Sequence, residues 1–226
     1  MKWECGDHPL KDKIDQIIYL CLLQADPIVI PSSSRITLAR LFSQMGYEAG
    51  AEIGVGSGPY SEIICRANPG VHLYCIDAWQ PYPEYIDFTD PGHLEGDYNN
   101  AIINLAPYNV TIVRKMSADA VQEFYSGSLD FVYIDANHNH PYIDEDIENW
   151  SRIVRSGGIV SGHDYINGHS HVMQAVDDYV ATHNIHPYYL VGTPGEHDNV
   201  DKICSWFWMQ PRPGKINAYS LPAQPA

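Results

Sequence analysis

The stretch AEIGVGSGPY, residues 51–60, decides the fold class of this 226-residue chain. It combines an acidic residue, three alternating glycines and a proline: Glu52, Gly54, Gly56, Gly58 and Pro59. The dinucleotide-binding pattern G-x-G-x-x-G would need its third glycine where this chain has proline, so that spacing is not met. Proline instead suits the first turn of a helix. The stretch therefore predicts a strand that ends in a tight glycine turn and leads into a helix.

Apolar runs and helical stretches alternate along the chain from this turn onward. The expected strands are GAEIGVG (50–56), VHLYCIDAW (71–79), VTIVRKM (110–116), LDFVYIDA (129–136) and GGIVSGHDY (157–165). The expected helices are residues 59–67, 93–106, 118–125, 142–155 and 170–182. Two further strands, 186–193 and 202–211, have no helix between them and are expected to be antiparallel neighbours. The pattern predicts an α/β fold with a Rossmann-like, doubly wound, mostly parallel seven-stranded sheet and an antiparallel C-terminal hairpin.

The expected domain organisation has three parts. Residues 1–49 contain two amphipathic stretches, KDKIDQIIYLCLLQ and SRITLARLFSQMG, and are expected to form an N-terminal helical cap. Residues 50–211 form the main domain. Residues 212–226 contain several prolines and are expected to be a loose tail.

Charge and composition restrict the partners. The formal net charge of −15 comes with no basic stripe, which argues against nucleic acid and anionic membranes. The five cysteines are scattered without a C-x-x-C pair, as is typical of reduced thiols in a cytoplasmic protein. No apolar run reaches membrane-spanning length, and we read no signal peptide. A small molecule is the expected partner, and the N-terminal helices are candidates for a homo-oligomer contact.

The glycine stretch resembles the first motif of the class I S-adenosylmethionine-dependent methyltransferases. Residues 52–58 read E-x-G-x-G-x-G, a strand ending in Asp77 follows, and the resemblance extends over about residues 50–210. It implies that S-adenosylmethionine is the cofactor and that the glycines let the backbone approach its amino-acid end. Glu52 would orient that loop or the methionine amino group, and Asp77 would accept hydrogen bonds from the ribose hydroxyls. The residues implied to lie near the adenine are Ser117, Ala118 and Asp119.

Acidic residues and histidines gather at the ends of two further strands. The expected fourth strand runs into Asp135 and His138, and the expected fifth into His163 and Asp164. Asp135 and Asp164 are about one crossover unit apart, which places them on neighbouring parallel strands that open into the same crevice. Carboxylates and imidazoles placed together there make a credible site for a divalent cation.

This second group resembles the metal-dependent O-methyltransferases of sugars and natural products, which include macrolide-sugar and rhamnosyl O-methyltransferases and cephalosporin hydroxylase-like proteins. The resemblance implies that Asp135, His163 and Asp164 hold a cation such as Mg²⁺ or Mn²⁺. His138 matches the position of a general base, so Asp135 and His138 are the expected catalytic residues. His163 stands where these relatives carry Glu, which leaves Mn²⁺, Fe²⁺ and Zn²⁺ as further choices.

The predicted function is O-methylation of a hydroxyl group on a small molecule, assisted by a divalent cation. Two alternatives stay open: a hydroxylase-like metalloenzyme on the same fold and a non-catalytic cofactor-binding partner subunit. Residues 80–99 form a Tyr- and Pro-rich insert that is placed to cover the cofactor and line the acceptor pocket. Trp79 either packs against the adenine or fills the core.

Overall fold

The protein is described by a computed structural model that covers residues 26–82, 90–166, 171–192 and 204–211. Eight strands form one sheet in the order β1-β7-β8-β6-β5-β2-β3-β4. The strands are β1 (Ile28–Ile30), β2 (Ala49–Ile53), β3 (His72–Asp77), β4 (Val110–Arg114), β5 (Leu129–Ile134), β6 (Val154–Gly162), β7 (Tyr189–Val191) and β8 (Ser205–Met209). The helices are α2 (Arg35–Gln44), α3 (Pro59–Ala67), α4 (Pro91–Leu105), α5 (Ser117–Ala120), the 3₁₀ helix η1 (Val121–Glu123), α6 (Tyr142–Ile153) and α7 (Val172–Thr182).

The predicted α/β class and sheet arrangement are confirmed. Strands β4, β3, β2, β5 and β6 run parallel, and β8 lies antiparallel between β6 and β7. The sheet has one strand more than the seven expected. The additional strand is β1, which pairs in parallel with β7 at the edge of the sheet. Three residues are too few to show a strand period, and β1 depends on its pairing with β7, which the local sequence does not reveal.

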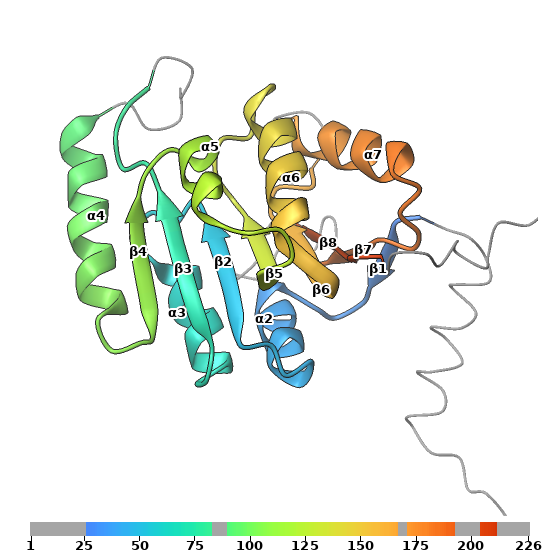
Figure 1. Ribbon diagram of the computed structural model, residues 1–226, viewed down its shortest axis with the longest axis horizontal. Coiled ribbons are helices and arrows are strands. Elements are labelled where there is room, and N and C mark those ends of the chain that lie inside the picture. The colour runs from blue at the N-terminus through green and yellow to red at the C-terminus, as the bar shows by residue number, and fades with distance from the viewer. Residues whose placement is uncertain (1–25, 83–89, 167–170, 193–203, 212–226) are drawn as a thin grey trace, which may run out of the picture.

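Helices cover both faces of the sheet (Figure 1). Helices α5, α6 and α7 pack on one face over a core that includes Trp150 and Trp206. Helices α2, α3 and α4 pack on the other face, around Phe42, Ile64 and Phe131. Strand β5 reads LDFVYI and is buried along almost its whole length, as a central parallel strand covered on both sides should be.

The helices begin and end close to where the sequence predicts them. Helix α3 starts at Pro59 as expected, whereas the stretch expected to be helical over 118–125 forms α5 and then one 3₁₀ turn. Of the expected N-terminal cap, residues 1–25 lie outside the described residues, and so does the expected tail 212–226. The rest of the cap contributes β1 to the sheet and α2 to the core. No helix within the described ranges has the length and apolar character needed to span a membrane.

Candidate active site

The carboxyl ends of the central parallel strands open into one cavity of about 790 Å³. Its wall comes from the loop after β2, the end of β3, the stretch before α5, the loop after β5 and one side of α6. Parallel strands place all these segments at the same edge of the sheet, where ligands of open α/β sheets bind. The volume lies within the range of small-molecule sites.

Backbone geometry explains the glycines at 54 and 56. Their φ angles are 89° and 54°, in the left-handed region that favours glycine, and both residues line the cavity. A Cβ atom on Gly54 would lie 2.0 Å from the main-chain oxygen of Asp135, so no other residue fits there without displacing the β5 loop. Gly58, the third glycine of the motif, precedes the first residue of α3 and lies against Leu105 instead of in the cavity wall.

Glu52 is a buried carboxyl group in the wall of the cavity. Glu52 is 2% exposed, and its Oε2 accepts a hydrogen bond from the hydroxyl of Ser61. Burial raises the pKa of Glu52 to about 8, although the Ser61 hydrogen bond and the charge of Arg35 act in the opposite direction. Without a ligand, Glu52 is therefore mostly protonated at neutral pH.

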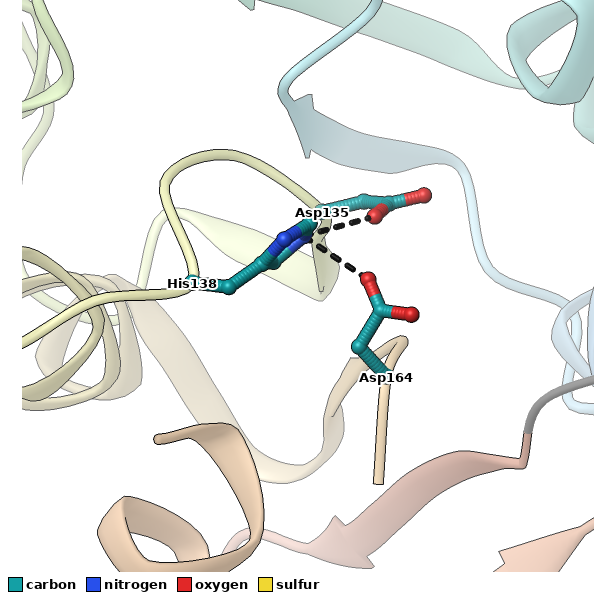
Figure 2. A group of neighbouring side chains, drawn as sticks. All are labelled: Asp135, His138 and Asp164. Atoms are coloured by element: carbon teal, nitrogen blue, oxygen red, sulfur yellow. Dashed lines mark ion pairs between the residues drawn. The ribbon is translucent and has the colours of Figure 1, made fainter. Parts of the chain in front are cut away.

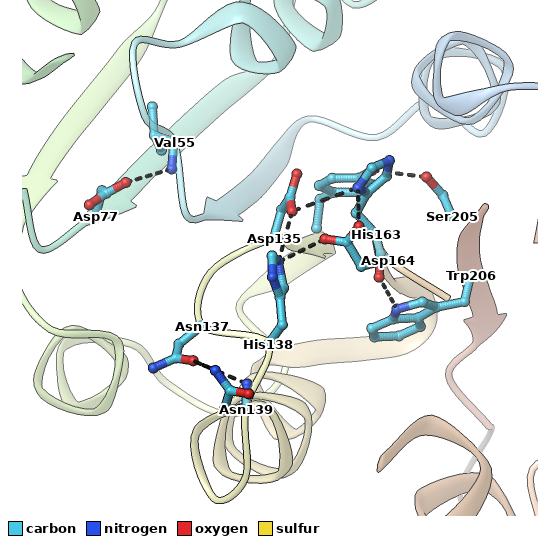
Figure 3. A network of polar contacts seen from close by, with 11 residues as sticks. Val55, Asp77, Asp135, Asn137, His138, Asn139, His163, Asp164, Ser205 and Trp206 are labelled. Atoms are coloured by element: carbon cyan, nitrogen blue, oxygen red, sulfur yellow. Dashed lines mark hydrogen bonds and ion pairs between the residues drawn. The ribbon is translucent and has the colours of Figure 1, made fainter. Parts of the chain in front are cut away.

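Asp77 holds the glycine loop. Its Oδ2 accepts hydrogen bonds from the backbone N–H groups of Val55 at 2.9 Å (Figure 3) and Gly56 at 3.0 Å. Its Oδ1 accepts one from the backbone N–H of Trp79 at 2.8 Å. Burial raises the pKa of Asp77 while these backbone donors lower it, and burial has the larger effect. A carboxylate can accept about four hydrogen bonds, so Asp77 retains capacity for one ligand hydroxyl. A second hydroxyl would need another acceptor, and Asp97 of α4 also lines the cavity.

Trp79 is buried and fastens the same loop. It is 2% exposed, its Nε1 donates to the carbonyl oxygen of Gly56 at 2.8 Å, and its ring lies 5.0 Å from that of Tyr98. Of the two interpretations left open by the sequence, packing in the core is thus observed. The ring also borders the cavity, beside Gln80 and Tyr82 of the 80–99 insert. Residues 83–89 of that insert lie outside the described residues.

The predicted adenine segment lies only partly in the cavity. Ser117 and Ala118 line it, whereas Asp119 is exposed and does not. A different acid, Asp146 of α6, stands in the wall and accepts a hydrogen bond from the Ser117 hydroxyl. Burial raises the pKa of Asp146 to about 7. Asp146 was not predicted from the sequence, although an acid on the apolar face of α6, which Trp150 shares, was a detectable signal.

Asp135, His138 and Asp164 form a compact cluster next to the glycine loop. His138 Nε2 lies 2.7 Å from Asp164 Oδ2 and 3.5 Å from Asp135 Oδ1, so the imidazole stands between the two carboxylates (Figure 2). One ligand atom from each residue lies within 4.8 Å of the others. Burial alone would lower the pKa of His138, but hydrogen bonds to both acids raise it to about 10. The imidazole therefore carries a proton when no cation is present.

His163 borders this cluster. Its Nδ1 is 3.3 Å from Asp164 Oδ1 and 3.8 Å from Asp135 Oδ1 (Figure 3). Burial would raise the pKa of Asp164, but hydrogen bonds from His138 and His163 and their charges hold it below its usual range. The structure thus brings all four predicted residues together, with the His138 imidazole between the two acids and His163 at the border of the cluster. Spacing along the chain could not decide which imidazole lies between the acids.

A family model described as a methyltransferase domain matches residues 51–165. The chain belongs to this methyltransferase family. The match spans the glycine loop, Asp77 and both strand ends that carry the acids, so the resemblance read from residues 52–58 is confirmed. No curated protein matches the chain.

Solved structures show that this methyltransferase has the class I fold. The O-methyltransferase from Bacillus cereus in complex with SAH is 14% identical, with a TM-score of 0.56 over 91% of this chain and 92% of that one. The O-methyltransferase TomG from Streptomyces achromogenes, involved in tomaymycin synthesis and in complex with SAM, is 14% identical, with a TM-score of 0.55 over 80% and 83%. The N-methyltransferase NodS from Bradyrhizobium japonicum is 13% identical, with a TM-score of 0.52 over 79% and 95%. Oxygen and nitrogen acceptors thus share the fold, which by itself does not select the acceptor atom.

Most of the charged side chains in the cavity wall of this methyltransferase are acidic. The described residues in its wall include the acids Glu52, Asp77, Asp97, Asp135, Glu145 and Asp146, against the cations Arg35 and Lys115 and the imidazole of His138. An excess of carboxylates in a partly enclosed site favours a positively charged ligand. The cluster at Asp135 adds groups that can hold a cation or bind a hydroxyl group beside that ligand.

Proposed function

We propose that the chain binds S-adenosylmethionine in this cavity and transfers its methyl group to a hydroxyl oxygen of a small molecule. Contact between the glycine loop and the acid cluster is the observation that carries the proposal. The backbone of Gly54 touches that of Asp135, and Asp135 N donates to the carbonyl oxygen of Ile53 at 2.7 Å. An acceptor bound at the cluster would therefore lie directly beside a cofactor seated on the loop.

The parts of the cofactor are assigned from the groups around the cavity. The loop at Gly54 and Gly56 would face its amino-acid end, and Asp77 would accept one ribose hydroxyl while it continues to hold the loop. Ser117 and Ala118 would lie at the adenine, with Asp146 in place of the predicted Asp119. The acidic wall would stabilise the positive sulfonium.

Methyl transfer is an in-line displacement in which a bond from the acceptor oxygen to the methyl carbon forms while the carbon–sulfur bond breaks. Alignment of the two reactants is the main contribution the protein can make. Asp135 would orient the acceptor hydroxyl toward the methyl group from the end of β5. The hydroxyl proton would pass to a water molecule as the neutral thioether forms, and a hydroxyl bound to a divalent cation would lose it more easily.

The residues of the cluster fit a divalent cation. Two carboxylates and an imidazole that converge within 4.8 Å are a donor set of the kind preferred by Mn²⁺, Fe²⁺ or Zn²⁺ more than by Mg²⁺. We propose Asp135, His138 and Asp164 as the ligands, with His163 orienting Asp164. This differs from the arrangement predicted from the sequence, in which His163 is the ligand and His138 takes the proton.

Mass spectrometry of candidate acceptors incubated with the protein, S-adenosylmethionine and Mn²⁺ tests the function. We expect a hydroxylated small molecule to gain one methyl group. Asp135→Asn should lower the rate by about a hundredfold or more, as loss of a group that positions reactants commonly does. Asp119→Asn, an exposed acid outside the cavity, is the matched control and should leave the rate unchanged.

The same measurement separates the alternatives. Gain of one oxygen atom would identify a hydroxylase, and no product from a broad panel, despite cofactor binding, would identify a non-catalytic subunit. A methylated amine in place of a methylated hydroxyl would keep the methyltransferase and reject the oxygen acceptor.

A further inference from the structure

Arg35 is a cation in the cavity wall that was not predicted from the sequence. It is the first residue of α2 and borders the cavity together with Glu52, Gly54 and Tyr60. The wall segments described above all follow strands β2 to β5, whereas Arg35 comes from a helix that precedes β2. Its position is therefore set by packing between α2 and α3 and not by the sheet.

Tyr60 of α3 holds Arg35 in two ways. Its hydroxyl donates to the carbonyl oxygen of Arg35 at 2.9 Å, which fixes the start of α2. Its ring lies under the guanidinium, with the Arg35 Cζ 5.3 Å from the ring centroid. Tyr60 itself is 2% exposed and packs against the ring of Tyr133 at 4.3 Å. A guanidinium supported on a buried ring, with its backbone fixed, loses little freedom when it binds a ligand.

Arg35 and Glu52 bring a guanidinium and a carboxyl group to the cavity wall beside the glycine loop. Both residues line the cavity, Arg35 from the start of α2 and Glu52 from the end of β2, two residues before Gly54. The charge of Arg35 acts to lower the pKa of Glu52. Of the other basic groups in the described wall, Lys115 follows β4 and forms an ion pair with Glu123, and His138 lies between Asp135 and Asp164. The cavity therefore presents a cation and a carboxyl group. An ammonium group bound beside Glu52 would favour the ionised form of this carboxyl group, and the pair would then complement a zwitterionic amino acid.

We infer that Arg35 binds the carboxylate of the cofactor's amino-acid end, while Glu52 faces its ammonium group. The inference rests on the proposed function and names the residue that distinguishes the complete cofactor from nucleosides without the amino acid. A planar guanidinium matches a carboxylate through two parallel N–H donors, a geometry that a lysine cannot reproduce.

Calorimetric affinities for two ligands test the inference. S-adenosylhomocysteine and 5′-deoxy-5′-methylthioadenosine share the nucleoside and the thioether, but only the first carries the amino-acid carboxylate. We expect Arg35→Met to weaken binding of S-adenosylhomocysteine by about tenfold to a hundredfold, as expected for loss of a charge-assisted hydrogen-bond pair. Its affinity for methylthioadenosine should stay within about twofold of that of the wild type. Arg35→Lys should give an intermediate loss.

Arg40→Met is the matched control, because Arg40 is an exposed arginine on the same helix, and neither affinity should change. Equal losses for both ligands in Arg35→Met would show that Arg35 only supports the cavity wall, and the inference would be rejected. Unchanged binding of S-adenosylhomocysteine would reject it too and leave an anionic acceptor as the partner of Arg35. If the wild type binds neither ligand, the proposed function fails as well, an outcome distinct from both of these.

Discussion

Asp164 has a backbone conformation that only a few residue types adopt readily. Its φ angle is 59°, in the left-handed region, at a cost on the order of 1 kcal/mol or more for a residue with a side chain. The next residue holds the turn in place, because Tyr165 N donates to the carbonyl oxygen of Cys204 at 3.0 Å and the Tyr165 hydroxyl to Asp177 at 2.7 Å. This strained turn directs the carboxylate of Asp164 toward His138.

The two imidazoles beside Asp164 should differ in their effect on metal binding. If Asp135, His138 and Asp164 are the ligands, His138→Ala should weaken Mn²⁺ binding by at least about tenfold, and His163→Ala by less. Titration calorimetry with Mn²⁺ measures both. The reverse order would restore the arrangement predicted from the sequence, with His163 as the ligand.

Removal of the metal tests whether methyl transfer depends on the cation. Protein stripped with EDTA should lose methyl transfer and recover it when Mn²⁺ is added. His183→Ala, an exposed histidine at the end of α7, is the control for histidine loss and should behave like the wild type. Full activity in thoroughly stripped protein would contradict a role for a cation.

At the scale of elements, the turn from β2 to α3 depends on glycine for two different reasons. Gly54→Ala would both strain the backbone and drive a methyl group into the main chain of Asp135, so we expect a loss of more than about 3 kcal/mol in the free energy of unfolding. The methyl group added by Gly56→Ala would point into open space. We therefore expect a loss of only about 1 kcal/mol in the free energy of unfolding, caused by the left-handed φ of residue 56. Chemical denaturation of both variants measures the difference. Equal losses would mean that contact with the β5 loop adds nothing.

Elements with a strong local pattern could be predicted from the sequence. Helix α3 was correct to its first residue because Pro59 marks a helix start and the residues after it repeat with a helical period. The short strand β1 was missed because it exists through its pairing with β7, about 160 residues further along the chain. Strand ends could be placed at one edge of the sheet in advance, since that follows from parallel topology alone.

Residues of the candidate site could be predicted from the sequence where they directly follow a strand. Those that lie on helices could not. Asp77, Asp135 and Asp164 were found because each stands at the end of an apolar run. Asp146 and Arg35 lie on helices, where only tertiary packing decides whether a polar side chain faces solvent or a cavity. The exposure of Asp119 on α5, outside the cavity wall, was not evident from the sequence for the same reason.

At the scale of the whole molecule, buried acids make stability depend on pH. Glu52 has a pKa of about 8 in the folded chain against an ordinary value of 4.5. The unfolded chain therefore releases this proton at lower pH than the folded chain does. The contribution of Glu52 to stability is fully present below about pH 4.5, decreases as the pH rises toward 8 and is constant above that.

Glu52→Gln should remove this dependence, because glutamine stays neutral and can still accept the hydrogen bond from Ser61. Relative to the wild type, the variant should gain on the order of 2 to 4 kcal/mol in the free energy of unfolding between pH 4 and pH 8, measured without ligand. Glu48→Gln, at an exposed position, controls for the loss of one charge from the chain. A constant difference between Glu52→Gln and wild type across this range would contradict the prediction.

The contact between Gly54 and Asp135 has a consequence for how new activities can arise on this scaffold. Because the turn after β2 and the acid after β5 rest on each other's main chain, neither can shift alone. Insertions, deletions and new side chains in the surrounding loops can change which compound is accepted, while the reacting centre keeps its dimensions. Attempts to widen specificity should thus begin at the 80–99 insert and leave this pair of turns untouched.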